Sequence, residues 1–186
     1  MIKLLLLVIA LAALLVLVYV KSSPSAQLKV GALAPAFSLM DQNGQLRQSD
    51  EFKGRWLVLY FYPKDNTPGC TTEAMQFRDK YKEFVKAGAT VFGVSRDNMK
   101  SHDDFKMKLE LPFELIADTE EKMCHMFGVV KNKIMYGKKV KGIERSTFLI
   151  GTDGTLKEEW RGLKVPGHVD DVLKAVKDLK KVAVVA

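Results

Sequence analysis

Residues 56–70 read WLVLYFYPKDNTPGC and contain the signals for a strand, a loop and the start of a helix. The first seven residues form a continuous apolar run, which is typical of a central strand covered on both faces. Pro63 then fixes the backbone ahead of a polar loop, and Pro68 and Gly69 end that loop tightly. Apolar residues recur at helical spacing over residues 70–86. The stretch therefore predicts the strand-loop-helix unit of an α/β domain.

Cys70 stands at the junction between this loop and the helix. A thiol in the first turn of a helix lies near unsatisfied backbone N–H groups and the positive end of the helix dipole, and both favour the thiolate. Thr67, one turn earlier, is expected to cap the helix and to offer its hydroxyl to the sulfur. A buried, inert thiol is the alternative, but Pro68 and Gly69 argue against it because they place Cys70 outside any apolar helix face.

The rest of the chain alternates predicted strands and helices. Asn43-Gly44 predicts a hairpin between short strands at 37–39 and 45–47. Further strands are predicted over 90–94, 113–117, 145–150 and 156–161, and further helices over about 98–109, 119–127 and 169–179. This order indicates an α/β fold with parallel crossovers and an antiparallel edge. Residues 131–142 are basic and without clear period, and we expect them to form a loop or long arm near the site.

The run FYPKDNTPGCTTEAMQFRD, residues 61–79, and the later IERSTFLI, residues 143–150, together resemble the peroxiredoxins. The nearest branch is the Q-type or bacterioferritin comigratory protein branch, and the resemblance extends from about Val30 to about Leu179. It implies a thioredoxin-like fold in which helices flank a central mixed sheet. It also implies a thiol-dependent peroxidase that reduces hydrogen peroxide and organic hydroperoxides, needs no cofactor, and is recycled by a thiol such as a thioredoxin-like protein.

The resemblance assigns roles to individual residues. The family's Pro, Thr and peroxidatic Cys fall on Pro63, Thr67 and Cys70, and its second-site Arg falls on Arg145. From local sequence alone, Arg145 reads as a surface charge at the start of a strand. In the family role its guanidinium would hold Cys70 as the thiolate and polarise the peroxide, which Thr67 would also contact.

Two neighbours of Cys70 are expected to support it. Gly69 keeps the loop-to-helix junction tight, and Glu73 is a first-turn acid that suits the helix dipole and also orients Arg145.

The chain departs from the Q-type pattern in its second thiol. The resolving cysteine usually found five residues after the first is replaced by Met75. Cys124, which has Met123 and Phe127 beside it, reads first as a packed core thiol and second as a resolving partner. We therefore expect a one-cysteine cycle in which an external thiol reduces the oxidised Cys70.

The N-terminal residues form a separate segment. Residues 4–20 contain no charged residue and are followed by a polar linker. A helix of this length spans about 26 Å, at the short edge of what crosses a bilayer core. We expect a cleaved signal peptide or a membrane anchor, and divide the chain into residues 1–26, this segment with its linker, and residues 27–186, a peroxiredoxin domain. Positive charge at the N-terminus favours keeping that end in the cytoplasm, so we expect the downstream domain to be exported. The domain would then lie in the periplasm, or stay anchored to the membrane and face the periplasm or the exterior.

The composition of the chain limits the classes of binding partner that we expect. The formal net charge is +7, but the lysines scatter along the chain, so we expect a solvated surface and no nucleic-acid binding. The two cysteines and three histidines lack the spacing of a zinc site, and no metal is expected. We expect a monomer or weak dimer. Two other classes stay open. One is a redox sensor or partner-binding thioredoxin-like module in which oxidation of Cys70 alters an interface. The other is a disulfide-handling or metal-delivery thioredoxin relative, although the absence of a CxxC or CxxxC pair argues against it.

Overall fold

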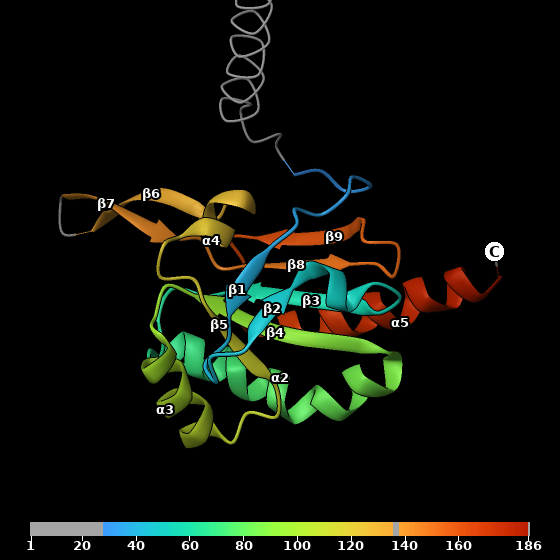
Figure 1. Ribbon diagram of the computed structural model, residues 1–186, viewed down its shortest axis with the longest axis horizontal. Helices are drawn as coiled ribbons and strands as arrows, with labels where there is room; N and C mark the ends of the chain where they lie inside the picture. The colour runs from blue at the N-terminus through green and yellow to red at the C-terminus, as the bar shows by residue number, and fades with distance from the viewer. Residues whose placement is uncertain (1–27, 136–137, 186) are drawn as a thin grey trace, which may run out of the picture.

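The computed structural model describes residues 28–135 and 138–185, drawn in colour in Figure 1. The predicted signal or anchor segment, residues 1–26, lies outside these residues. Within the described ranges, no helix is both long and apolar enough to span a membrane.

A five-stranded sheet in the order β5-β4-β3-β8-β9 forms the centre of the domain. Its strands are β3 (Trp56–Phe61), β4 (Ala89–Ser95), β5 (Glu114–Ala117), β8 (Ser146–Ile150) and β9 (Leu156–Arg161). β3, β4 and β5 are parallel, whereas β8 is antiparallel to β3 and β9 is antiparallel to β8. The predicted combination of parallel crossovers with an antiparallel edge is confirmed.

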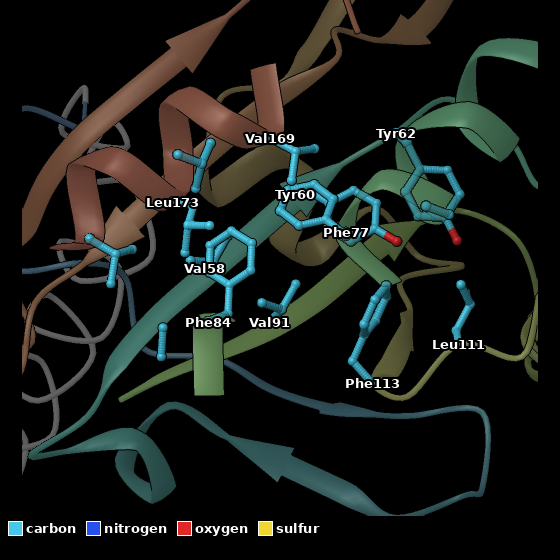
Figure 2. Close-up of a cluster of buried hydrophobic side chains, with 14 of the residues drawn as sticks. Val58, Tyr60, Tyr62, Phe77, Phe84, Val91, Leu111, Phe113, Val169 and Leu173 are labelled. Carbon is cyan, nitrogen blue, oxygen red and sulfur yellow. The ribbon is translucent and has the colours of Figure 1, made fainter. Parts of the chain in front are cut away.

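The side chains of β3 divide the interior of the domain into two apolar clusters. Trp56, Val58 and Tyr60 belong to a first cluster, and Leu57 and Leu59 belong to a second. Figure 2 shows Val58 and Tyr60 within the first cluster, among side chains from neighbouring elements. A strand that buries both of its faces needs an unbroken apolar sequence, which explains the apolar run over residues 56–62.

Helices cover both faces of the sheet (Figure 1). The first cluster lies under α2 (Pro68–Ala87), α3 (Met99–Leu109) and α5 (His168–Val185), and the second lies under α4 (Lys122–Met126) and the 3-10 helix η1 (Ser49–Phe52). α2 is followed by Gly88 at a φ of 84°, in the left-handed conformation that glycine adopts without strain.

Two hairpins lie outside the main sheet. The predicted hairpin at Asn43-Gly44 is confirmed, as β1 (Ser38–Met40) pairs with β2 (Leu46–Gln48). Residues 131–142 were predicted to form a loop or long arm, and the second alternative is the one observed, because β6 (Val130–Met135) and β7 (Lys138–Ile143) pair as an antiparallel ribbon. Neither face of a two-stranded ribbon has to be buried against a core, so the sequence need not show the apolar alternation from which strands are predicted.

Candidate active site

Cys70 is the third residue of α2, and only 1% of its surface is exposed. It belongs to the first apolar cluster, so the expectation that it lies outside any apolar helix face is wrong. Pro68 is the first residue of the helix, a position where the missing N–H costs no hydrogen bond. The helix therefore begins two residues earlier than predicted, and Cys70 remains within its first turn. The unpaired N–H groups and the helix dipole of that turn stabilise negative charge on the sulfur.

Arg145 immediately precedes β8 and reaches Cys70 from the other half of the chain. Its Nη2 donates a hydrogen bond to Cys70 Sγ at 3.3 Å, and its Nη1 pairs with the Glu73 carboxylate. The planar guanidinium can serve both acceptors at once. Gly69 leaves room for this approach, since a Cβ at that position would lie 3.3 Å from Arg145 Nη2. The structure thus brings together Cys70, Gly69, Glu73 and Arg145.

Glu73 is fully buried beside the thiol. One carboxylate oxygen pairs with Arg145, while Oε1 has no hydrogen-bond partner among the described residues. Burial raises the pKa of the Glu73 carboxyl to about 7, although the charge and hydrogen bond of Arg145 act in the opposite direction. A group that titrates near neutral pH therefore holds the guanidinium that contacts Cys70.

Thr67 occupies the N-cap position of α2, but its hydroxyl does not cap the helix. Oγ1 instead donates to the carbonyl oxygen of Lys64 at 2.9 Å, so the predicted side-chain cap is wrong. The reason is local competition, because a threonine hydroxyl can close a turn within its own loop. The oxygen keeps its acceptor lone pairs. Pro63 is half-buried at the start of the same loop.

Cys124 lies in the second cluster, on the opposite face of the sheet from Cys70 in the first. Its side chain is buried, and its backbone N–H donates to Asp118 Oδ2 at 2.7 Å. Burial, reinforced by the negative charge of Asp118, raises the pKa of the Cys124 thiol well above its usual range. A thiol held in the protonated form is a weak nucleophile. Met75 is partly exposed on α2.

Two buried polar residues beside this site, Asp65 and His102, could not be predicted from the sequence. Asp65 lies in the loop before α2, and His102 lies on α3 with its ring against the Asp65 carboxylate. An aspartate in a loop reads as an ordinary turn residue, and a lone histidine in a helix carries no motif. Only the fold brings the two together.

Within the part of the chain that the structure describes, no group of three or more His, Cys, Asp or Glu side chains is placed to hold a metal ion.

Comparison with known proteins gives consistent matches. The family model described as the AhpC/TSA family matches residues 30–159. A protein named Peroxiredoxin Bcp from Bacillus subtilis is 46% identical over 154 residues, covering 83% of this chain and 98% of the relative. A putative peroxiredoxin bcp from Coxiella burnetii is 47% identical over 146 residues, covering 78% and 97%.

Comparison with solved structures gives matches to the same group of proteins. A structure of Xanthomonas campestris Peroxiredoxin Q is similar to this chain with a TM-score of 0.77 and 47% identity, covering 84% of this chain and 99% of the other. A further structure, of the bacterioferritin comigratory protein of the same organism, has the same TM-score and identity, covers 83% and 99%, and is described as giving insights into alkyl peroxide reduction activity.

Proposed function

Because the chain belongs to the AhpC/TSA family, among the Bcp and PrxQ peroxiredoxins, we propose that it works by a one-cysteine cycle centred on Cys70. The protein is a thiol-dependent peroxidase on a thioredoxin-like fold with a mixed central sheet, and the predicted fold and activity are confirmed.

In the first half of the cycle, the Cys70 thiolate attacks the terminal oxygen of a hydroperoxide. A sulfur–oxygen bond forms as the oxygen–oxygen bond breaks, so the sulfur is oxidised to sulfenic acid and the peroxide is reduced. The leaving hydroxide or alkoxide takes a proton and departs as water or an alcohol.

The observation that carries this assignment is the hydrogen bond of 3.3 Å from Arg145 Nη2 to Cys70 Sγ. In the reaction, negative charge spreads from the sulfur over the two peroxide oxygens, and a guanidinium already at the sulfur stabilises that charge without reorganising. In this assignment Glu73 holds the Arg145 guanidinium in place, and Gly69 leaves the space that the guanidinium needs to reach the sulfur. The Thr67 oxygen and the loop that begins at Pro63 position the peroxide.

In the second half of the cycle, an external thiol attacks the sulfenic sulfur, so that a mixed disulfide forms as the sulfur–oxygen bond breaks and the oxygen leaves as water. A second thiol equivalent then attacks this disulfide, releasing reduced Cys70 and the oxidised disulfide form of the reductant. The reductant we propose is a small thioredoxin-like protein. The position of Cys124 on the opposite face of the sheet supports an external donor. We propose that the peroxidase acts as a monomer or weak dimer.

We also propose an exported protein in which residues 4–20 act as a signal peptide or anchor, on the grounds of their uncharged sequence. Fractionation of cells that express the full chain, with mass analysis of its N-terminus, tests this. An intact chain confined to the cytosolic fraction would overturn the proposal.

Cys70→Ser tests the assignment of the nucleophile. A serine hydroxyl is a poor nucleophile without a dedicated base, so peroxide consumption with a supplied dithiol should fall to the uncatalysed rate. Stopped-flow measurement of peroxide gives the rate, and an unchanged unfolding transition shows that the variant is folded. Appreciable turnover by the folded variant would exclude Cys70 as the nucleophile.

A further inference from the structure

Asp65 carries a buried carboxylate in the middle of the loop that leads to Cys70. Its side chain is 2% exposed and accepts three hydrogen bonds from other side chains. The donors are Tyr62 Oη at 2.7 Å, Ser101 Oγ at 2.8 Å and His102 Nδ1 at 2.9 Å. Two of these donors come from the first turns of α3, so the loop is attached to that helix.

The ring of His102 lies between two acceptors. Nδ1 faces Asp65 Oδ2 at 2.9 Å, and Nε2 faces the carbonyl oxygen of Ile116 at 3.2 Å. Both ring nitrogens therefore face oxygen atoms, one from the Asp65 side chain and one from the backbone of β5. The side chain is fully buried, so bulk water cannot replace either contact.

The backbone of the loop is held in the same way. The N–H of Asp65 donates to Asp97 Oδ2 at 2.8 Å, and Asp97 is itself held by Ser95 Oγ at 2.7 Å. Asn66 has a φ of 58°, a left-handed conformation that costs a non-glycine residue about 1 kcal/mol and persists only where the surroundings enforce it. Lys108 Nζ on α3 donates to Asn66 Oδ1 at 3.0 Å.

A buried pair of hydrogen-bonded polar side chains such as Asp65 and His102 is weak evidence of a role in stability alone, because an apolar replacement is often equally stable. Asp65 lies between Pro63 and Thr67 in sequence, within the segment that we assign to positioning the peroxide, and His102 contacts it from α3. We propose that Asp65 and His102 form a positioning pair for the peroxidase reaction, by which α3 fixes the loop that presents Thr67 and Cys70 to the peroxide. The proposal rests on the assigned role of Cys70.

The test compares two reactions of Cys70. Reduction of peroxide needs the whole loop in place, whereas alkylation by iodoacetamide needs only the thiolate. Asp65→Asn, His102→Gln and the double variant are compared with Asp104→Asn, which removes an exposed ion pair with Lys100 from the same helix. Each reaction is measured as a second-order rate constant, with alkylation at Cys70 followed by peptide mass.

We expect each single variant to slow peroxide reduction by about 10- to 100-fold and to slow alkylation by less than about threefold. The rate constant for peroxide reduction in the double variant should be no lower than in the slower of the two single variants, because the two residues act as a unit. Asp104→Asn should behave as the wild type.

Three results would overturn the proposal: an unchanged peroxide rate in folded variants, equal losses in both reactions, or losses that multiply in the double variant. If Asp65→Asn or His102→Gln fails to fold, Ser101→Ala serves instead, because it removes only one hydrogen bond to Asp65. Ser101→Ala should lower the ratio of the peroxide rate to the alkylation rate by about threefold. An unchanged ratio would overturn the proposed role of the pair. Cys70→Ser in the same peroxide assay separates this outcome from failure of the proposed nucleophile.

Discussion

The role of Arg145 depends on its contacts with two acceptors on α2. The fork of the guanidinium lets one nitrogen donate to Cys70 Sγ while the other pairs with Glu73. A lysine would carry the same charge as a single point and could not hold both contacts in a fixed plane. The side chain at this position therefore supplies direction as well as charge.

Arg145→Lys should slow the reaction with hydrogen peroxide by more than about tenfold, because the charge remains but the planar donor is lost. The measurement is the second-order rate constant, taken together with the pH at which Cys70 becomes reactive toward an alkylating agent. Arg55→Lys, at an exposed position immediately before β3, serves as a control. If both quantities are unchanged in Arg145→Lys, the guanidinium has no part in the reaction.

Glu73→Gln should have an effect that grows with pH. Burial raises the pKa of the Glu73 carboxyl to about 7, so the group is mostly protonated at pH 6 and mostly ionised at pH 8. Glutamine imitates the protonated form. The ratio of wild-type to variant peroxide rates should be within about twofold at pH 6 and rise to about tenfold at pH 8, where only the wild type pairs a carboxylate with Arg145. A ratio that stays flat from pH 6 to pH 8 would contradict this role.

Among the strands, β4 shows how closely the sheet fits the helices. Gly93 lies opposite Tyr60 on β3 and Leu115 on β5. A Cβ at Gly93 would lie 2.7 Å from atoms of both side chains. The Tyr60 ring in turn stacks on Phe77 of α2, with ring centroids 4.5 Å apart, and both rings are labelled in Figure 2. The missing side chain thus lets a tyrosine lie across the strand and support the helix that carries Cys70.

Gly93→Ala should lower the free energy of unfolding by about 2 kcal/mol, because the added methyl group must displace Tyr60 or Leu115 in a packed core. Denaturant unfolding measures the loss. Thr90→Ala in the same strand, at a half-buried position, should cost less than about 1 kcal/mol. Equal losses in the two variants would show that the core yields at Gly93.

The elements differ in how far the sequence predicts them. Every strand of the main sheet was predicted, because burial on one or both faces leaves an apolar run or an alternation in the sequence. The strands of the ribbon β6-β7 were not predicted individually within the expected loop or arm, because their basic sequence shows neither an apolar run nor a clear alternation. The hydroxyl of Thr67 was misplaced, because several local partners compete for it and only the folded loop decides among them.

At the scale of the whole molecule, the site depends on contacts that cross the chain. Cys70 and Thr67 could be assigned from their local spacing, but Arg145 only through the family resemblance, since 75 positions separate it from the thiol. Asp65 and His102 could not be paired by either route. Sequence periodicity reports which face of an element is buried, and it does not report which buried polar groups meet.

The whole molecule also separates its two thiols. Cys70 and Cys124 lie in clusters on opposite faces of the central sheet. A disulfide requires two Cα atoms within about 7 Å, so a bond between them would require the core to open. In addition, burial and Asp118 disfavour the thiolate of Cys124.

Cys124→Ser should therefore retain most of its turnover with a small-molecule dithiol, since the recycling thiol comes from outside the chain. Met75→Cys should gain a disulfide to Cys70 after peroxide treatment, because residue 75 lies on the same helix and needs only local unwinding to reach the sulfenic acid. Mass analysis of non-reduced peptides after one equivalent of peroxide distinguishes the species, with Cys70→Ser in the Met75→Cys background as the control that cannot form the bond. A near-stoichiometric bond between Cys70 and Cys124 in the wild-type chain would overturn the one-cysteine cycle, and would imply that the core on one face of the sheet opens in every turnover.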